Sequence, residues 1–422
     1  MAESDATQSD VVVTGLGVIS ALGAGMARNW QRLCAGQGGI DRISRFDPEL
    51  FESQVAGEVR DFDPLNYMER KEARRMDRFA QLAVGAAREA LDSAHFAIAA
   101  SNADRVGVIL GSAMGGMGAI EEAYATFHAR GPSRVSPFFV PMMLADLAAG
   151  QVSILLGARG PNWAPVSACA TGAHAIGEAA AIIRRGDADA ILAGGAEAPI
   201  TPASVAGYAS MGALSRHNTE PRRASRPFDR ERDGFVIGEG AGVLLLERAD
   251  FAMRRGAPIL AAVVGYGATA DAYHIVEPSP GGEGAARAMR LALASARMGP
   301  ADVGYLNAHG TSTPTNDRLE TAAIKSVFGP MARRLPVSST KGATGHTLGA
   351  GGSIEAAFAI MAMQSAVLPP TINYQTPDPD CDLDYIPNAA REVSALNVVM
   401  SNSLGFGGHN ASIVFARTGL LR

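Results

Sequence analysis

The stretch Pro165-Val166-Ser167-Ala168-Cys169 is echoed later in the chain as Pro336-Val337-Ser338-Ser339-Thr340. A Gly-containing turn follows each copy, and then an Ala-rich run that is typical of a buried helix, over residues 172–185 and 349–364. Five matched positions are a weak signal alone. The repeated order of strand, reactive turn and buried helix strengthens it and predicts two related α/β halves.

Short apolar runs alternate with Ala-rich helical stretches along the whole chain. A helix is expected over residues 77–91, and strands are expected at 11–14, 106–110, 190–193, 243–246, 262–264, 305–307, 398–400 and 412–415. Strands this apolar are usually covered on both faces, which favours an α/β fold. The charged stretch 247–256 indicates a connecting helix and turn, so we expect an N-terminal half over 1–255 and a C-terminal half over 256–422.

The composition restricts the class of protein. The 422 residues are 47% hydrophobic and carry a formal charge of −5, which argues against a general nucleic-acid binder. Three scattered cysteines are too few for a disulfide framework and fit a reducing compartment. No apolar run reaches the ~18 residues of a membrane span, and residues 1–6 lack the basic-then-apolar order of a signal peptide. We expect a cytoplasmic protein without a membrane segment.

Cys169 is the first candidate for catalysis. It lies where an apolar stretch gives way to the Ala/Gly-rich helical pattern, so its sulfur should face the unpaired N–H groups of a helix start, which favour the thiolate. Cysteines in apolar sequences are more often inert, but the small neighbours here leave room for a substrate. We expect Cys169 to take and hold an acyl group, and Cys34 and Cys381 to be structural.

Two further segments supply histidines. His309 follows an expected strand, and reactive groups of α/β sheets gather at the carboxyl ends of strands. His346 ends the stretch Lys341-Gly342-Ala343-Thr344-Gly345-His346, which takes the place of the Cys169 turn in the second copy. If the halves pack as related copies, both turns converge and bring a His and a Lys beside the thiol. The alternatives are a structural His309 and a phosphate-binding loop, although the Gly-x4-Gly-Lys-Ser/Thr pattern is incomplete.

Glycine-rich segments carry two more signals. Phe406 stands alone among glycines in residues 401–410, where it could act as a gate while nearby N–H groups approach a substrate oxygen; an ordinary turn is an equal alternative. The stretch Gly15-Leu16-Gly17 imitates a dinucleotide fingerprint, but Ser20 stands where the third glycine is needed, so NAD binding is discounted. The remaining histidines lack metal-ligand spacing, which makes a zinc site improbable.

The combination of Cys169, His309, Lys341 and His346 resembles the β-ketoacyl-[acyl-carrier-protein] synthases of the thiolase-like superfamily, and most of all their elongating, synthase II type. The resemblance runs from about residue 10 to 417 and includes the segments Ile191–Glu197, Ala224–Asp229, Arg232–Phe235, Gly238–Gly242 and Asp271–His274. It implies an α/β thiolase-like fold, in which two similar halves stack as a five-layer αβαβα core. The second histidine, His346, is the mark of decarboxylating elongation in this family.

The resemblance also implies a reaction. Cys169 accepts an acyl chain from an acyl-carrier-protein thioester, and the neutral rings of His309 and His346 stabilise the enolate that malonyl-carrier protein forms on losing carbon dioxide. The carbanion then attacks the acyl-Cys carbonyl in an oxyanion hole made by the N–H groups of Cys169 and Phe406. Lys341 holds the network in place. No organic cofactor is implied.

Secondary roles follow from the same resemblance. The acyl pocket and gating loops are expected to use Met114, Phe139, Tyr208, Asp271, His274, Asp317 and Leu404, with Phe406 as the gate, Phe139 reaching a dimer partner's pocket and Asp317 a polar partner of the loop of Asp271 and His274. Leu404 replaces a frequent Phe of the family. A structural K⁺ or Na⁺ is expected at Asn307, Glu355, Ser401 and Asn402, although Glu355 could equally be paired within a hydrogen-bond network.

The expected partners are acyl carrier protein, in its acyl and malonyl forms, and a second copy of the chain in a homodimer. The basic cluster of Lys71, Arg74 and Arg75 would meet the acidic carrier, although charge clusters are usually solvated helix faces. A ketosynthase of a type II polyketide or specialised lipid pathway is the same-fold alternative. A non-catalytic chain-length subunit is disfavoured, because such subunits lack the thiol that Cys169 supplies.

Overall fold

The two halves of the chain have the same strand order. In the computed structural model, which describes residues 10–420, the first half contributes β1 (Val11–Ser20), β5 (Val106–Gly111), β6 (Asn162–Trp163), β7 (Ala190–Glu197) and β8 (Gly240–Arg248), in the spatial order β1-β8-β7-β5-β6. The second half contributes β9 (Ala261–Ala270), β10 (Tyr305–Asn307), β11 (Val337–Ser338), β14 (Val398–Gly405) and β15 (His409–Ala416), in the order β9-β15-β14-β10-β11. The duplication inferred from the sequence is therefore a duplication of topology.

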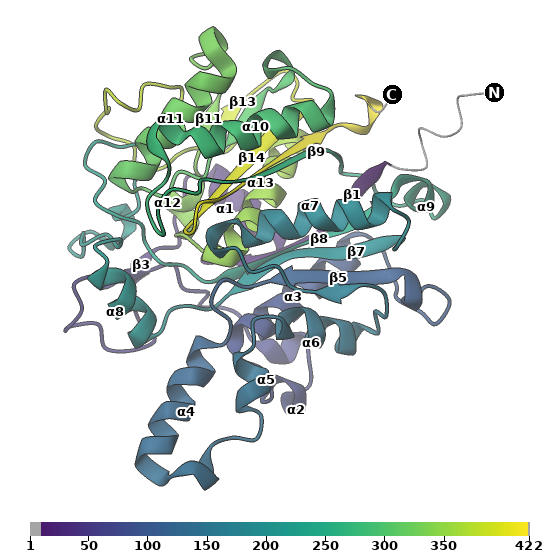
Figure 1. The fold of residues 1–422 in the computed structure, drawn as a ribbon, viewed down its shortest axis with the longest axis vertical. Coiled ribbons are helices and arrows are strands. Elements are labelled where there is room, and N and C mark those ends of the chain that lie inside the picture. Colours follow the sequence, from purple (N-terminus) through teal and green to yellow (C-terminus); the bar gives the residue numbers. More distant parts are fainter. Residues whose placement is uncertain (1–9, 421–422) are drawn as a thin grey trace.

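Helices separate and cover the two sets of strands. Strands β1 and β9 pair only at Val12–Ala262 and Val13–Ala261, which joins the sets edge to edge. The helices α7 (Thr171–Arg184) and α13 (Gly351–Ser365) pack on each other between the sets, as Figure 1 shows. The outer layers are α3 (Arg78–Ser93) with α6 (Leu147–Leu156), and α10 (Glu283–Ala296) with α11 (Pro314–Phe328). The predicted five-layer thiolase-like fold is confirmed.

Strand β1 is longer than the predicted 11–14 and includes Gly15 and Gly17. A Cβ at Gly15 would lie 2.0 Å from the main-chain oxygen of Ala90, and one at Gly17 would lie 1.8 Å from that of Ala86. Both oxygens belong to α3, whose predicted start is confirmed by the Asp77 side chain accepting from the Phe79 N–H. The glycines that imitate a nucleotide fingerprint therefore allow a helix to lie directly on the strand.

The remaining elements complete the halves. They are α1 (Met26–Cys34), α2 (Arg70–Ala73), α4 (Met117–Arg130), α5 (Phe139–Met143), α8 (Pro202–Ser210), α9 (Ala249–Arg254), α12 (Lys341–Thr344), and the short strands β2 (Gly23–Ala24), β3 (Asp41–Arg42), β4 (Val55–Ala56), β12 (Val367–Leu368) and β13 (Arg391–Glu392). Helix α9 lies in the predicted connection, close to the expected division between residues 255 and 256. Residues 1–6, on which the expectation of no signal peptide rests, lie outside the described residues. Within residues 10–420, no helix is long and apolar enough to cross a membrane.

Candidate active site

Cys169 lies at the junction that leads into α7. A 3-10 turn over Ala168–Ala170 precedes the helix, and Ala168 has a φ of 49°, a backbone conformation that non-glycine residues avoid. The strand expected in the repeated stretch from Pro165 is absent there, and the nearest strand, β6, ends at Trp163; Pro161 and Pro165 flank β6 and cannot donate to a sheet. The strained turn directs the Cys169 side chain into a cavity of about 360 Å³.

Burial of the Cys169 sulfur opposes the thiolate that the sequence predicts. Cys169 is only 7% exposed, and burial raises its pKa to about 12. The Lys341 ammonium and the Phe406 N–H, which donates to the sulfur, lower the pKa by less than burial raises it. These two groups therefore offset only part of the cost of burying a charged sulfur.

His309 is held at the end of β10 by a buried carboxylate. The main-chain N–H groups of His309 and Gly310 each donate to Glu320 on α11, at 2.8 Å. The Lys341 ammonium donates to the His309 carbonyl at 2.6 Å, lies 3.4 Å from Nδ1 of the ring, and forms an ion pair with Glu355. Burial lowers the pKa of His309 well below its ordinary value, and Lys341 lowers it further, so the imidazole is uncharged at neutral pH.

His346 follows α12, and its main chain is fixed on both sides. Its N–H donates to the Val236 carbonyl at 2.7 Å, and its carbonyl accepts from Gly238 at 2.9 Å. The Phe235 ring lies 5.3 Å from the imidazole, edge to face. Burial lowers the pKa of His346 well below its ordinary value, and the Lys341 ammonium contributes. Both histidines are therefore neutral rings able to donate one N–H each.

The structure brings the three expected reactive side chains together. The Cys169 sulfur and one nitrogen each of His309 and His346 lie within 4.8 Å of one another, and the two rings lie 5.2 Å apart at 83°. Their shared cavity continues outward past Leu404 and Phe406. A thiol, two neutral imidazoles and a main-chain N–H at the sulfur form a set that can hold an acyl group and stabilise an oxyanion.

The expected acyl-pocket residues divide into two groups. Met114 and Tyr208 pack in one apolar cluster with Cys169, and the Tyr208 hydroxyl lies 3.6 Å from the Met114 sulfur. Leu404 and Phe406 line the cavity mouth. Phe139 does not line this cavity; it is half-buried at the start of α5, which with α4 projects from the body of the protomer (Figure 1).

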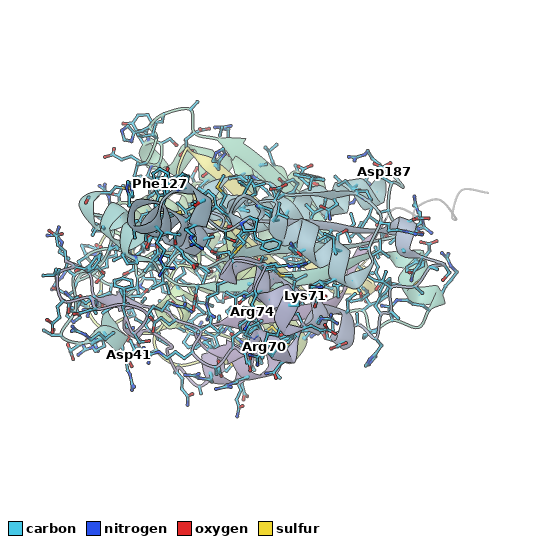
Figure 2. All side chains as sticks on the ribbon, turned by 90° about the horizontal axis from the view of Figure 1, so that it is seen from below. Asp41, Arg70, Lys71, Arg74, Phe127 and Asp187 are labelled. Carbon is cyan, nitrogen blue, oxygen red and sulfur yellow. The ribbon has the colours of Figure 1, made fainter. Side chains whose placement is uncertain are left out.

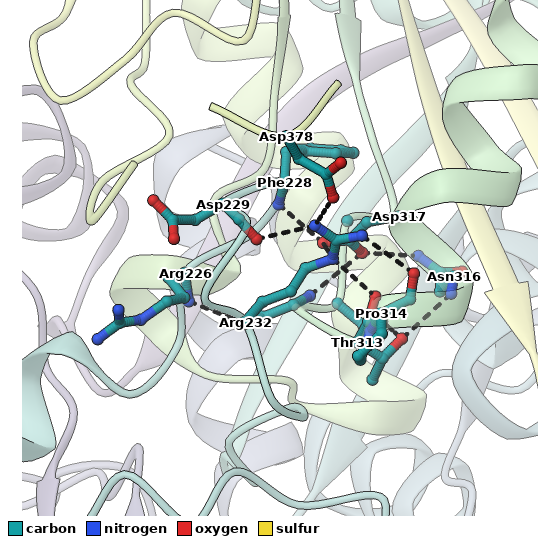
Figure 3. Close-up of polar contacts among 12 residues, drawn as sticks. Arg226, Phe228, Asp229, Arg232, Thr313, Pro314, Asn316, Asp317 and Asp378 are labelled. Atoms are coloured by element: carbon teal, nitrogen blue, oxygen red, sulfur yellow. Dashed lines mark hydrogen bonds and ion pairs between the residues drawn. The ribbon is translucent and has the colours of Figure 1, made fainter. Parts of the chain in front are cut away.

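The structure does not place Asp317 as the polar partner of the loop of Asp271 and His274. Asp271 lines the cavity and accepts from Asn410 at 2.8 Å, whereas His274 is exposed and binds the N–H groups of its own turn. Asp317 does not join that loop. It accepts from the N–H groups of Phe228 and Ser312 and pairs with buried Arg232, as Figure 3 shows, because a buried carboxylate requires nearby donors.

The residues expected at the cation site fit it in part. Asn307 and Ser401 are directly opposite each other in the β10–β14 pairing, and Asn307 Oδ1, Ser401 Oγ and Glu355 Oε2 are buried atoms without a hydrogen-bond partner among the described residues. The Asn402 side chain differs. Its oxygen accepts from Ser412 at 2.8 Å and its nitrogen faces Glu320, so these interactions already occupy it.

Lys71 and Arg74 lie with Arg70 on one exposed face of the protein (Figure 2). The Arg75 guanidinium lies 4.8 Å above the Phe138 ring, next to α5. None of these four side chains forms an ion pair with an acid in residues 10–420. The cluster therefore presents basic side chains that are not held in ion pairs, and Arg75 lies beside α5.

Sequence reasoning missed three residues of the site. Glu320 fixes the His309 main chain, and its only sequence signal is an acid on the same helix face as Asp317, one turn earlier. Thr311 and Thr313 line the cavity, with their hydroxyls 2.9 Å apart. They lie in the segment that also supplies His309, so that segment forms a wall of the site as well.

Comparisons of sequence assign both halves to one family. The family described as "Beta-ketoacyl synthase, N-terminal domain" matches residues 8–252, and "Beta-ketoacyl synthase, C-terminal domain" matches residues 260–375. A relative named 3-oxoacyl-[acyl-carrier-protein] synthase 2, from Staphylococcus aureus, is 52% identical over 96% of this chain and 98% of its own length. A relative of the same name from Synechocystis sp. is 49% identical over the same shares.

Solved structures agree. A β-ketoacyl synthase from Burkholderia phymatum is 38% identical, covers 97% of this chain and 99% of its own, and superposes with a TM-score of 0.90. A type II polyketide ketosynthase complex with its acyl-carrier protein has a matching chain that is 35% identical, with the same coverage and a TM-score of 0.89.

Proposed function

The chain belongs to the β-ketoacyl synthase family, and on that premise we propose that it elongates fatty-acyl chains by condensing an acyl group on Cys169 with malonyl-acyl-carrier protein, giving 3-oxoacyl-acyl-carrier protein and carbon dioxide. The observation that carries this proposal is the convergence of the Cys169 sulfur with His309 and His346 within 4.8 Å, at one cavity. The 52% identity to a 3-oxoacyl-[acyl-carrier-protein] synthase 2 favours this reaction over the polyketide alternative, because the ketosynthase chain of the type II polyketide complex is 35% identical.

In the first half-reaction, the sulfur of Cys169 attacks the thioester carbonyl of the acyl donor. The C–S bond to the carrier breaks, and the thiol proton ends on the released carrier thiol, so the exchange needs no further reactant. The N–H of Phe406, which donates to the sulfur before the substrate binds, is the first proposed donor to the negative charge that develops on the carbonyl oxygen. The main-chain N–H of Cys169 is the second donor of this oxyanion hole.

In the second half-reaction, malonyl thioester loses carbon dioxide and leaves an enolate. The neutral rings of His309 and His346 each donate one N–H to the enolate oxygen. Such hydrogen bonds are stronger in a buried cavity than in water. The enolate carbon attacks the acyl-Cys carbonyl, a C–C bond forms, and the Cys169 sulfur leaves as a thiolate, which takes up one proton from solvent to restore the thiol. Lys341 holds His309 in place by donating to its main-chain carbonyl and by contacting Nδ1 of its ring.

The test is a mass measurement with matched variants. Incubation with acyl-carrier-protein donor should add one acyl mass to Cys169, and Cys34→Ser should leave that addition unchanged. Cys169→Ala should lose both the adduct and condensation. Cys169→Gln, which imitates an acylated site, should still decarboxylate malonyl-carrier protein. A folded Cys169→Gln protein that is silent toward malonyl thioester would contradict the roles given to the histidines.

The carrier and the second copy are proposed partners. The basic cluster of Lys71, Arg74 and Arg75 lies beside α5, and an acidic carrier would be attracted to it. Strand β6 is an edge strand with exposed Trp163, and Tyr124, Phe127 and Val140 expose further apolar surface on α4 and α5. A homodimer that covers this surface would bring Phe139 toward the partner's pocket. Light scattering should give a molar mass of twice the chain mass, and Trp163→Asp should reduce that molar mass to the mass of a single chain.

A structural K⁺ or Na⁺ is proposed at the three unpartnered oxygens of Asn307, Glu355 and Ser401, with the side chain of Asn402 left out. Such an ion would bind these three oxygens, which have no hydrogen-bond partner among the described residues, and would take no part in bond making. Removing K⁺ and Na⁺ should lower the melting temperature, and Ser401→Ala should reduce that dependence. We also propose a cytoplasmic location, which fits three free thiols.

A further inference from the structure

Glu197, at the end of β7, is a fully buried carboxylate that the reaction above does not use. Its Oε1 accepts from the Ser112 hydroxyl at 2.7 Å and the Met114 N–H at 3.1 Å. Its Oε2 accepts from the Ala113 N–H at 2.7 Å and the Gly349 N–H at 2.9 Å. Among residues 10–420 no lysine or arginine pairs with it, so its contacts are neutral donors from two separate segments.

Those two segments lie against each other beside the apolar cluster that contains Cys169. Met114 packs in the apolar cluster of Cys169. Gly349 follows Leu348, which belongs to that cluster, lines the cavity and has a φ of 44°. His346 begins the same turn. Glu197 therefore connects a loop of the N-terminal half to the catalytic turn of the C-terminal half.

We propose that Glu197 is a positioning residue that fixes the Met114 wall of the acyl pocket against the Leu348 turn, and so sets which acyl lengths Cys169 accepts. This inference rests on the proposed function, because it assigns a specificity role within the same site. All four groups that face the Glu197 carboxylate donate hydrogen bonds, so this position requires a side chain whose two oxygens both accept. Gly115 donates to the Ser112 oxygen at 2.9 Å, which leaves the Ser112 hydrogen for Glu197.

The contact also explains a glycine. A Cβ at Gly349 would lie 2.6 Å from Glu197 Oε2 and 2.6 Å from the Ala113 nitrogen, so any other residue would push the two segments apart. Burial raises the pKa of Glu197 to about 7, whereas the four donors lower it. Four donors with no facing acceptor favour the ionised form, which a glutamine cannot imitate.

Glu197→Gln is the decisive variant. Whichever way its amide turns, its NH₂ group faces a main-chain N–H that loses its acceptor, either that of Met114 or those of Ala113 and Gly349. Glu247→Gln is the matched control, because Glu247 is equally buried but lies at the opposite end of the β7–β8 pair, about 23 Å away by strand rise. It binds Thr14 and Arg255, away from the pocket.

Two measurements test the proposal. Hydrogen exchange at the amides of Ala113, Met114 and Gly349 should quicken about tenfold or more in Glu197→Gln and stay unchanged in Glu247→Gln. The ratio of kcat/KM for the longest acyl donor that the unaltered enzyme accepts to kcat/KM for its acetyl donor should fall about tenfold in Glu197→Gln only. The acetyl chain serves as reference because it is too short to press on the Met114 wall.

If Glu197→Gln does not fold, Ser112→Ala removes one donor and should move both readouts in the same direction by a smaller factor. An unchanged ratio in a folded variant, or an equal change in Glu247→Gln, overturns the specificity role. If the unaltered protein forms no acyl adduct, the proposed function fails, whereas the amide exchange still decides whether Glu197 tethers the two segments.

Discussion

Replacing Lys341 with methionine should destabilise the protein by about 3–5 kcal/mol, because it leaves a buried charge without its partner. Lys341 is 1% exposed and Glu355 is 3% exposed, so water cannot replace the lost ion pair. One oxygen of Glu355 already lacks a hydrogen-bond partner among the described residues. Guanidinium unfolding followed by circular dichroism measures the loss, which the double variant Lys341→Met/Glu355→Gln should largely recover.

The pH dependence of this loss has a defined sign. Burial raises the pKa of Glu355 to about 7 even beside Lys341, from an ordinary value of 4.5. A carboxyl whose folded pKa lies above its unfolded value contributes stability at low pH and loses it as pH rises. Removing the ammonium raises that pKa further, so Lys341→Met should be more stable near pH 5 than near pH 8.

The control for this experiment is Lys325→Met, which removes the exposed pair with Asp382 and should cost less than about 1 kcal/mol. The reasoning is refuted if Lys341→Met unfolds within 1 kcal/mol of the unaltered protein at about pH 8. It is equally refuted if the double variant is no more stable than Lys341→Met alone.

Three further outcomes are expected. The double charge reversal Lys71→Glu/Arg74→Glu should raise KM for carrier-bound substrate about tenfold at low salt and less at high salt, whereas Arg185→Glu on another exposed site should not. Gly17→Ala places a Cβ 1.8 Å from a main-chain oxygen of α3, so chemical denaturation should show a loss of about 3 kcal/mol. Burial raises the pKa of Glu89 from 4.5 to about 7, so its ionisation should lower the melting temperature as the pH rises from 4.5 to 7. Glu89→Gln should abolish this fall in melting temperature.

The fold and the reactive side chains were predictable because they follow from local sequence. Apolar runs predicted the strands, and the echo of residues 165–169 at 336–340 predicted that two distant turns meet. The partners of buried acids were not predictable in this way. Asp317 forms an ion pair with Arg232, and Asn402 accepts a hydrogen bond from Ser412. The spacing of these residues in the sequence does not predict either contact. The burial of Cys169, which raises the pKa of its thiol, was also missed, because it depends on how the second half covers the sulfur.

The duplicated topology explains why one cavity can hold groups from both halves. Helices α7 and α13 meet reciprocally in the central layer: a Cβ at Gly172 would lie 2.8 Å from the Ser353 nitrogen, and one at Gly352 would lie 2.8 Å from the Ala173 nitrogen. Each helix thus presents a glycine to the main chain of the other near its own first turn. The turn before α7 carries Cys169, and the turn before α13 carries His346. Because the glycine contact brings the two helix starts together, the same close packing that joins the halves also sets the separation between nucleophile and imidazole.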